Sequence, residues 1–142
     1  MSCLPELALT VRQPWALFIL SPRIGKDIEN RTWPTRLRGR VWIHSSKGTT
    51  QREIADAINF AEMTGTVDPE ALSMPADSEF GAILGSVEIV DCVQRSDSPW
   101  FVGPNGFALR NPVRLVRPVQ CRGALSFWRV PADVLEQIRG AG

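Results

Sequence analysis

The chain is organised around nine consecutive residues, Gly25-Lys26-Asp27-Ile28-Glu29-Asn30-Arg31-Thr32-Trp33. In an extended strand, Glu29 and Arg31 point to one face and Lys26 to the other, because successive side chains alternate. Gly25 adopts a positive φ without strain, so a turn there would bring Lys26 back toward the other two. We therefore predict that an ammonium, a carboxylate and a guanidinium share one cleft. The alternative is a surface ion pair of Glu29 with Arg31, contributing under ~1 kcal/mol, beside a solvated Lys26.

The residues before this stretch are expected to form a strand and a short helix. Residues 7–11 are apolar and end on β-branched side chains, which favours a strand. Pro14 suits the start of a helix, and Ser21-Pro22 ends it after the apolar run 15–20. Trp15 is either a core residue whose indole N–H needs a partner or an aromatic wall for a base.

The residues after it combine arginine with tryptophan. Residues 34–40 read as a basic loop, and residues 41–45 alternate as a strand does. Four arginines between positions 31 and 40 lie beside Trp33 and Trp42. Proteins hold single-stranded nucleic acid with this combination, guanidinium on phosphate and aromatic face on base. A solvated loop next to core tryptophans would give the same pattern.

The rest of the chain predicts more strands and two more helices. A capping box of Thr50 and Glu53 begins an amphipathic helix that Gly65 ends, and we expect this helix to cover one end of a sheet. Residues 81–93 are typical of a central strand. Prolines are expected to place the later strands at sheet edges. Short strands are predicted at 107–109, 113–116 and 125–130, and a last helix from Pro131 to Gly140.

These elements sum to about six short, mostly antiparallel strands with two or three helices and no internal repeat. We predict an α+β fold, a small β-barrel with the helices packed outside, because closure of a barrel removes exposed sheet edges. The length of 142 residues fits one domain, 1–142.

Composition excludes several classes of protein. An apolar fraction of 44% with 22% charged residues is ordinary for a globular protein, and no apolar run reaches the ~18 residues of a membrane helix. The start of the chain lacks a secretory signal, so we expect a cytoplasmic protein. Cys3, Cys92 and Cys121 form no C-x-x-C pair, which favours free thiols. With His44 as the single histidine, we predict no metal and no other cofactor.

Charge is unevenly distributed along the chain although the net charge is only +1. Residues 1–47 carry eight Lys/Arg and three Asp/Glu (+5), residues 48–100 carry two and ten (−8), and residues 101–142 carry six and two (+4). If the two basic ends meet in the fold, they make a positive face that attracts phosphates. The alternative is that this dipolar distribution of charge has no role in binding and only favours solubility.

Three blocks of the sequence together resemble the ASCH domain family, whose members are PUA-like β-barrels. The family signature G-x-K-x-x-E-x-R is matched by Gly25, Lys26, Glu29 and Arg31. The other two blocks flank this signature: residues 9–16 (LTVRQPWA) precede it and residues 38–47 (RGRVWIHSSK) follow it. The segments 81–87 and 123–128 also resemble strands of the family, so the resemblance covers nearly the whole chain.

The resemblance implies a cleft that accepts RNA or a modified nucleoside or nucleotide. Lys26 and Arg31 would contact a phosphate or base edge, Glu29 would accept hydrogen bonds from a base or orient Lys26, and Trp15 would stack. The predicted ligand-binding residues come from the three matched blocks: Gln13, Trp15, Arg31, Arg38, His44 and Ser45. His44 is also consistent with a neutral core histidine.

Two other functions stay open at this point. Some similar family members are amidohydrolases that deacetylate N4-acetylcytidine with the signature lysine and a threonine three residues later, and this chain has Glu29 there. A metal-free hydrolase of RNA or an acylated nucleoside would use Lys26 and Glu29 as its catalytic pair, with Thr32, Ser45 or Ser46 as a substitute hydroxyl. In the third hypothesis the signature only stabilises a structural or partner-binding domain.

Overall fold

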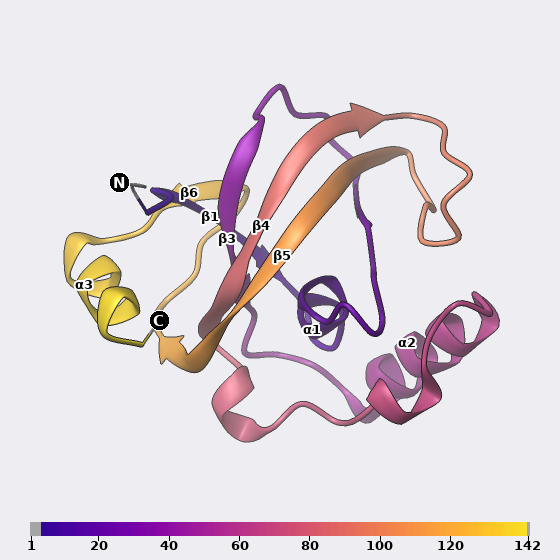
Figure 1. Ribbon diagram of the computed structural model, residues 1–142, viewed down its shortest axis with the longest axis horizontal. Coiled ribbons are helices and arrows are strands. Elements are labelled where there is room, and N and C mark those ends of the chain that lie inside the picture. Colours follow the sequence, from indigo (N-terminus) through magenta and orange to yellow (C-terminus); the bar gives the residue numbers. More distant parts are fainter. Residues whose placement is uncertain (1–3, 142) are drawn as a thin grey trace.

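A computed structural model describes residues 4–141 of the chain (Figure 1). Six strands and three α-helices follow one another, with two short 3-10 turns at Pro69–Ala71 and Asp77–Glu79. The elements are β1 (Leu7–Val11), α1 (Trp15–Leu20), β2 (Ile28–Arg31), β3 (Gly39–Ser45), α2 (Gln51–Met63), β4 (Ala82–Val93), β5 (Asn105–Gln120), β6 (Phe127–Arg129) and α3 (Ala132–Ala141).

All six strands belong to one sheet in the order β2-β5-β4-β3-β1-β6. The β1–β3 pair is parallel and the other pairs are antiparallel. The sheet is strongly curled, and the long strands β4 and β5 arch side by side across it (Figure 1). The result is a half-barrel with helices packed around it, which confirms the predicted α+β barrel-like fold.

Strand β5 corrects the sequence-based division of this region. It runs unbroken through Pro112 and Pro118, where two short strands were expected. Both prolines fall at shifts of register with β4: Asn111 and Pro112 stand opposite Val87 alone, and Asn111 has φ 54. Bulges of this kind absorb a residue that cannot donate to the ladder. The strand therefore bends at its prolines and does not end there.

Two further boundaries differ from those expected. Helix α3 continues through Gly140 to Ala141, so Gly140 does not end it. Strand β6 covers only Phe127–Arg129, because Ser126 adopts φ 57 and the residues before it leave the sheet. The predicted capping box of Thr50 is present at the start of α2, and Gly65 has the expected positive φ of 73° just beyond its end.

The two faces of the sheet are covered by different helices. Helix α1 packs on the concave face through Ile19 and Leu20, against core side chains such as Phe107. Helix α3 covers the opposite face with Val134 and Ile138. Helix α2 lies against α1 and the loop around residue 100, so it extends the α1 layer and its place differs from the predicted cover over one end of the sheet.

Cys92 and Cys121 are free thiols, and the third cysteine, Cys3, lies outside the described residues. Between residues 4 and 141, no helix is long and apolar enough to cross a membrane.

Candidate functional site

A turn at Gly25 brings Lys26 back over the strand that follows it. Gly25 has φ 71, and its N–H donates to the main-chain oxygen of Ser21 at 2.8 Å. The ammonium of Lys26 donates to the main-chain oxygen of Ile28 and lies 3.2 Å from Oε1 of Glu29. The Lys26 side chain is only 4% exposed. The predicted convergence of Lys26 with the carboxylate is therefore confirmed.

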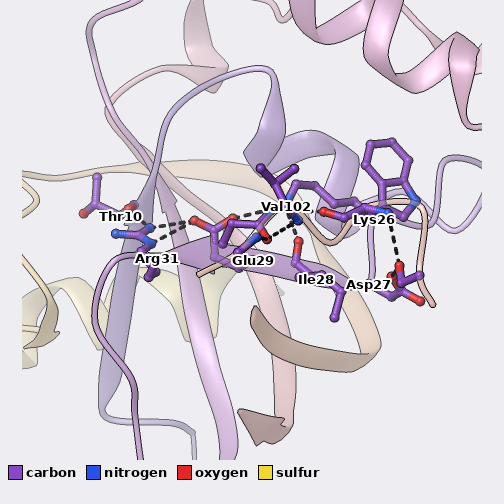
Figure 2. A network of polar contacts seen from close by, with 11 residues as sticks. Thr10, Lys26, Asp27, Ile28, Glu29, Arg31 and Val102 are labelled. Carbon is purple, nitrogen blue, oxygen red and sulfur yellow. Dashed lines mark hydrogen bonds and ion pairs between the residues drawn. The ribbon is translucent and has the colours of Figure 1, made fainter. Parts of the chain in front are cut away.

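Glu29 is shared by two cations. Oε1 faces Lys26, and Oε2 accepts from Nε of Arg31 at 2.9 Å. Arg31 also donates through Nη2 to the main-chain oxygen of Thr10 at 2.8 Å, so Figure 2 shows it between Thr10 and Glu29. The side chains of Glu29 and Arg31 are 10% and 21% exposed. Burial excludes the alternative of a surface ion pair beside a solvated lysine.

Strand β2 fixes this group against the rest of the sheet. Glu29 pairs with Phe107 of β5, and the amide of Asn30 reaches the loop that precedes β5. Asn30 donates to the main-chain oxygen of Trp100 at 3.0 Å and accepts from the N–H groups of Val102 and Gly103 at 2.8 and 3.0 Å. One amide side chain thereby ties the Trp100 loop to the strand that carries the charges.

The three charged groups lie at the floor of a pocket of about 740 Å³ with aromatic walls. The ammonium of Lys26 lies 5.6 Å from the ring centroid of Trp15, and Cζ of Arg31 lies 5.9 Å from that of Trp33. Two more aromatic rings, those of Phe60 and Trp100, line the pocket. Trp100 is buried, and Trp15, Trp33 and Phe60 are half-buried. The lining residues are Thr10, Val11, Arg12, Trp15, Lys26, Glu29, Asn30, Arg31, Thr32, Trp33, Phe60, Trp100 and Val102.

Four of the predicted site residues therefore meet in this pocket, and the other four lie elsewhere for identifiable reasons. Gln13 is buried and holds the backbone, accepting from Leu17 N–H and donating to the oxygen of Glu79. Ser45 is buried and exchanges hydrogen bonds with the main chain of Ala82. Arg38 is an exposed residue that donates to main-chain oxygens of its own loop.

His44, the fourth of these, lines a second, separate pocket of about 420 Å³. Nε2 lies 2.8 Å from the main-chain oxygen of Cys121, which only accepts, so Nε2 carries the proton. Nδ1 then accepts from the hydroxyl of Thr10 at 3.1 Å, and that hydroxyl accepts from the indole N–H of Trp128. Burial lowers the pKa of His44 below 6.5, and the hydrogen bond to Cys121 offsets part of that effect. His44 is thus a neutral, fully hydrogen-bonded histidine.

Several lining residues were not among the predicted site residues. Phe60 comes from a helix face and Trp100 from a loop, 34 and 74 positions from Lys26 by their numbers. Such distances along the chain leave no local pattern to detect. Asn30 lies inside the central nonapeptide, but its loop partner is about 70 residues away. The local signal for that loop is the aromatic pair at residues 100–101, which stands just before the turn residues 103–106.

The pocket can bind a planar group and hydrogen-bond its edge. Lys26, Arg31 and Arg12 supply three positive charges, and Glu29 with Glu53 neutralises two of them, since Glu53 accepts two hydrogen bonds from Arg12 at 2.9 and 2.8 Å. The Arg12 guanidinium holds the pKa of Glu53 below its usual value. The net charge of the pocket is therefore +1, and aromatic surface accounts for much of its wall.

Comparison with known proteins identifies the family. The family model described as the ASCH domain matches residues 9–101. Activating signal cointegrator 1 of Homo sapiens is 29% identical in an alignment of 140 positions that covers 89% of this chain and 22% of that protein. The Mus musculus protein of the same name is 27% identical with the same coverage. The chain spans about a fifth of the length of the curated relatives it matches.

Proposed function

The chain belongs to the ASCH domain family, and from this premise we propose that its aromatic pocket binds an unpaired base of RNA or a modified nucleoside or nucleotide. The observation that carries the proposal is the joining of aromatic walls to a hydrogen-bonding floor in one pocket of about 740 Å³. The walls are Trp15, Trp33, Phe60 and Trp100, and the floor is Lys26, Glu29 and Arg31.

The walls suit a base because each base has two aromatic faces. Stacking of a base on an aromatic side chain contributes about 1–3 kcal/mol and tolerates any sequence. Trp15 and Trp33 are half-buried, so part of each ring stays available to a ligand. Arg12, Thr32 and Val102 are exposed lining residues, which makes the pocket reachable from solvent.

The floor suits the polar edge of a base better than it suits a phosphate. Lys26 and Arg31 already share Glu29, so their charges are largely compensated. A base edge presents donors and acceptors together, and the floor offers the same mixture: N–H groups from Lys26 and Arg31 and carboxylate oxygens from Glu29. RNA-binding modules read splayed bases in this way, by stacking and hydrogen bonds to their edges.

Hydrolysis of RNA or of an acylated nucleoside is the alternative, with Lys26 and Glu29 as the catalytic pair. The contacts of the ammonium support binding over hydrolysis: Lys26 donates to Glu29 and to the main chain of Ile28, and no hydroxyl within residues 4–141 hydrogen-bonds either Lys26 or Glu29. Of the substitute hydroxyls Thr32, Ser45 and Ser46, only that of Thr32 belongs to a lining residue of this pocket among residues 4–141.

Titration of labelled RNA tests the proposal. Random-sequence single-stranded RNA with a fluorescent end label is titrated with the wild-type chain and followed by anisotropy. Lys26→Met keeps an apolar stem in the pocket while Glu29 retains Arg31, and we expect it to weaken binding roughly tenfold. Arg139→Ala, which removes one exposed cation on α3 outside the pocket, is the matched control and should bind as wild type does.

Chromatography of the incubated RNA, and of N4-acetylcytidine, separates binding from hydrolysis. Binding predicts unchanged RNA and unchanged nucleoside after long incubation. Product that appears with wild type, survives a chelator and disappears with Lys26→Met would establish the hydrolase instead. Failure of RNA and nucleoside alike to bind or react, in a chain that melts normally, would leave only the structural or partner-binding hypothesis.

A further inference from the structure

The second pocket adjoins the first across one residue of strand β1. Thr10 lines both pockets. Its main-chain oxygen accepts from Arg31 of the first pocket, and its hydroxyl contacts His44 of the second. Thr10 therefore connects the linings of the two pockets. The residues of the second pocket are Thr10, His44, Ser46, Lys47, Gly81, Cys121, Arg122, Gly123, Ala124 and Leu125.

The second pocket carries more uncompensated charge than the first. Lys47 and Arg122 line it and are exposed, and within residues 4–141 neither forms an ion pair or a side-chain hydrogen bond. No carboxylate is among its lining residues. His44 adds no charge, because it is buried and neutral with both ring nitrogens occupied. The two cations of the second pocket thus have no carboxylate partner, whereas Glu29 and Glu53 pair with the cations of the aromatic pocket.

The backbone places the lysine over this pocket. Gly81 has φ 65, and a Cβ added to it would lie 2.8 Å from Cγ of Lys47. The stem of Lys47 therefore lies directly on the Gly81 backbone. On the other side, Gly123 lies so close to His44 that an added Cβ would be 2.6 Å from Cε1 of the ring. These two glycines let the Lys47 stem and the Arg122 loop close in around the pocket.

We infer that the second pocket binds a phosphate group of the same RNA strand or nucleotide whose base enters the aromatic pocket. This inference rests on the proposed function and adds a preference to it: the chain holds a phosphorylated ligand across Thr10 and discriminates against a free nucleoside. Lys47 and Arg122 donate charge-assisted hydrogen bonds to phosphate oxygens, which are the strong kind. The two pockets bind different parts of the ligand because their charges differ. The first pocket, whose cations are paired with carboxylates, accepts the base, and the unpaired Lys47 and Arg122 of the second pocket accept the phosphate.

The experiment compares a double variant with a charge-matched control. Lys47→Ala/Arg122→Ala removes two exposed cations at the pocket, and Arg52→Ala/Arg139→Ala removes two exposed cations on α2 and α3. Each is titrated into the labelled single-stranded RNA over a series of KCl concentrations. We expect the pocket variant to bind roughly tenfold more weakly at low salt. Its slope of log affinity against log salt should shrink by about 0.7 for each phosphate that the protein no longer neutralises.

A second arm identifies the source of the phosphate. Quenching of tryptophan fluorescence reports the binding of a mixture of nucleosides and of the matching 5′-monophosphates. Wild type should prefer the monophosphates, and the pocket variant should lose that preference while binding nucleosides as before. The salt titration is then repeated with RNA that has no terminal phosphate. If the pocket variant still has a smaller salt slope than wild type, the bound group is an internal phosphodiester. If the two slopes become equal, it is a terminal phosphate.

The two proposals fail in different ways. If the pocket and control variants bind RNA equally, with equal salt slopes, while Lys26→Met weakens binding, the phosphate site is wrong and the base site stands. If nucleosides and monophosphates bind wild type with the same affinity, the phosphate site is also wrong. If wild-type protein binds no RNA and no nucleotide, both proposals are overturned together.

Discussion

Arg31 of β2 donates a hydrogen bond to the main-chain oxygen of Thr10 in β1, although three strands separate β2 and β1 in the order of the sheet. The curl of the half-barrel brings these strands together, and the guanidinium spans the gap between them at 2.8 Å. The same guanidinium holds the carboxylate of Glu29. Arg31 therefore links strands β1 and β2 across the open side of the half-barrel, and it also lines the pocket. We call this link the clasp.

Replacing Arg31 tests the clasp. Lysine keeps the charge but cannot make the forked contact to Thr10 and Glu29 at once. We expect Arg31→Lys to lower the free energy of unfolding by about 1–3 kcal/mol, the contribution of a hydrogen bond to a charged group. Urea unfolding measures it. Arg129→Lys, on an exposed pair with Glu6, is the matched control and should change the free energy by less than about 1 kcal/mol.

The buried pair of Lys26 and Glu29 predicts a strongly non-additive mutant cycle. Glu29→Gln leaves the ammonium, 4% exposed, without its carboxylate, and we expect a loss of about 3–5 kcal/mol in the free energy of unfolding. In Lys26→Met/Glu29→Gln that charge is gone, so the double variant should be more stable than Glu29→Gln alone. Urea unfolding of all four proteins gives the coupling. Additive losses would mean that the pair contributes nothing jointly.

Two glycines predict opposite effects of alanine. An added Cβ at Gly123 would lie 2.6 Å from the ring of His44 and 2.7 Å from the hydroxyl of Thr10, so Gly123→Ala must displace the loop. Gly140 lies in α3 with no atom within 4 Å of an added Cβ. We expect Gly123→Ala to lower the melting temperature by several degrees and Gly140→Ala to raise stability by up to about 1 kcal/mol. Thermal unfolding checks both.

His44 predicts a pH dependence of stability. Its pKa in the folded chain lies below the ordinary 6.5, because burial disfavours the charged ring. As the pH falls, the unfolded chain therefore binds more protons than the folded chain. The contribution of His44 to the free energy of unfolding is complete above about pH 7 and decreases toward pH 5. His44→Gln should flatten this interval. Glu53 and Asp68, whose carboxyl pKa values are also lowered, act only at more acidic pH. A wild-type curve that is flat from pH 7 to 5 would contradict the prediction.

The sequence predicted most of the fold because its signals are local. The capping box at Thr50, the β-branched run of β4 and the positive φ available to Gly25 each act within a few residues. The prolines of β5 do lie where the strand has a partner on one side only, as expected, but the expected break into two short strands was wrong. Strand β5 pairs with β2 only up to Ala108, and its later prolines fall where the far side has no partner strand and the register with β4 shifts. Local sequence does not show where a partner strand stops.

The candidate site was predictable only where its members are close in sequence. Lys26, Glu29 and Arg31 converge because one turn and one strand place them. Strand alternation did not show which face of β3 looks into a pocket, so His44 and Ser45 were grouped with them although they serve the packing and the second pocket. The walls formed by α2 and the Trp100 loop depend on tertiary packing.

The two outermost strands of the sheet are also its shortest, with four residues in β2 and three in β6. A second chain that approaches either border finds too few free N–H and C=O groups to dock in register, and the remaining open stretch of β5 is interrupted by Pro112 and Pro118. The curled sheet stays unclosed, yet it offers neighbouring molecules little template for the edge-to-edge growth that leads to aggregates.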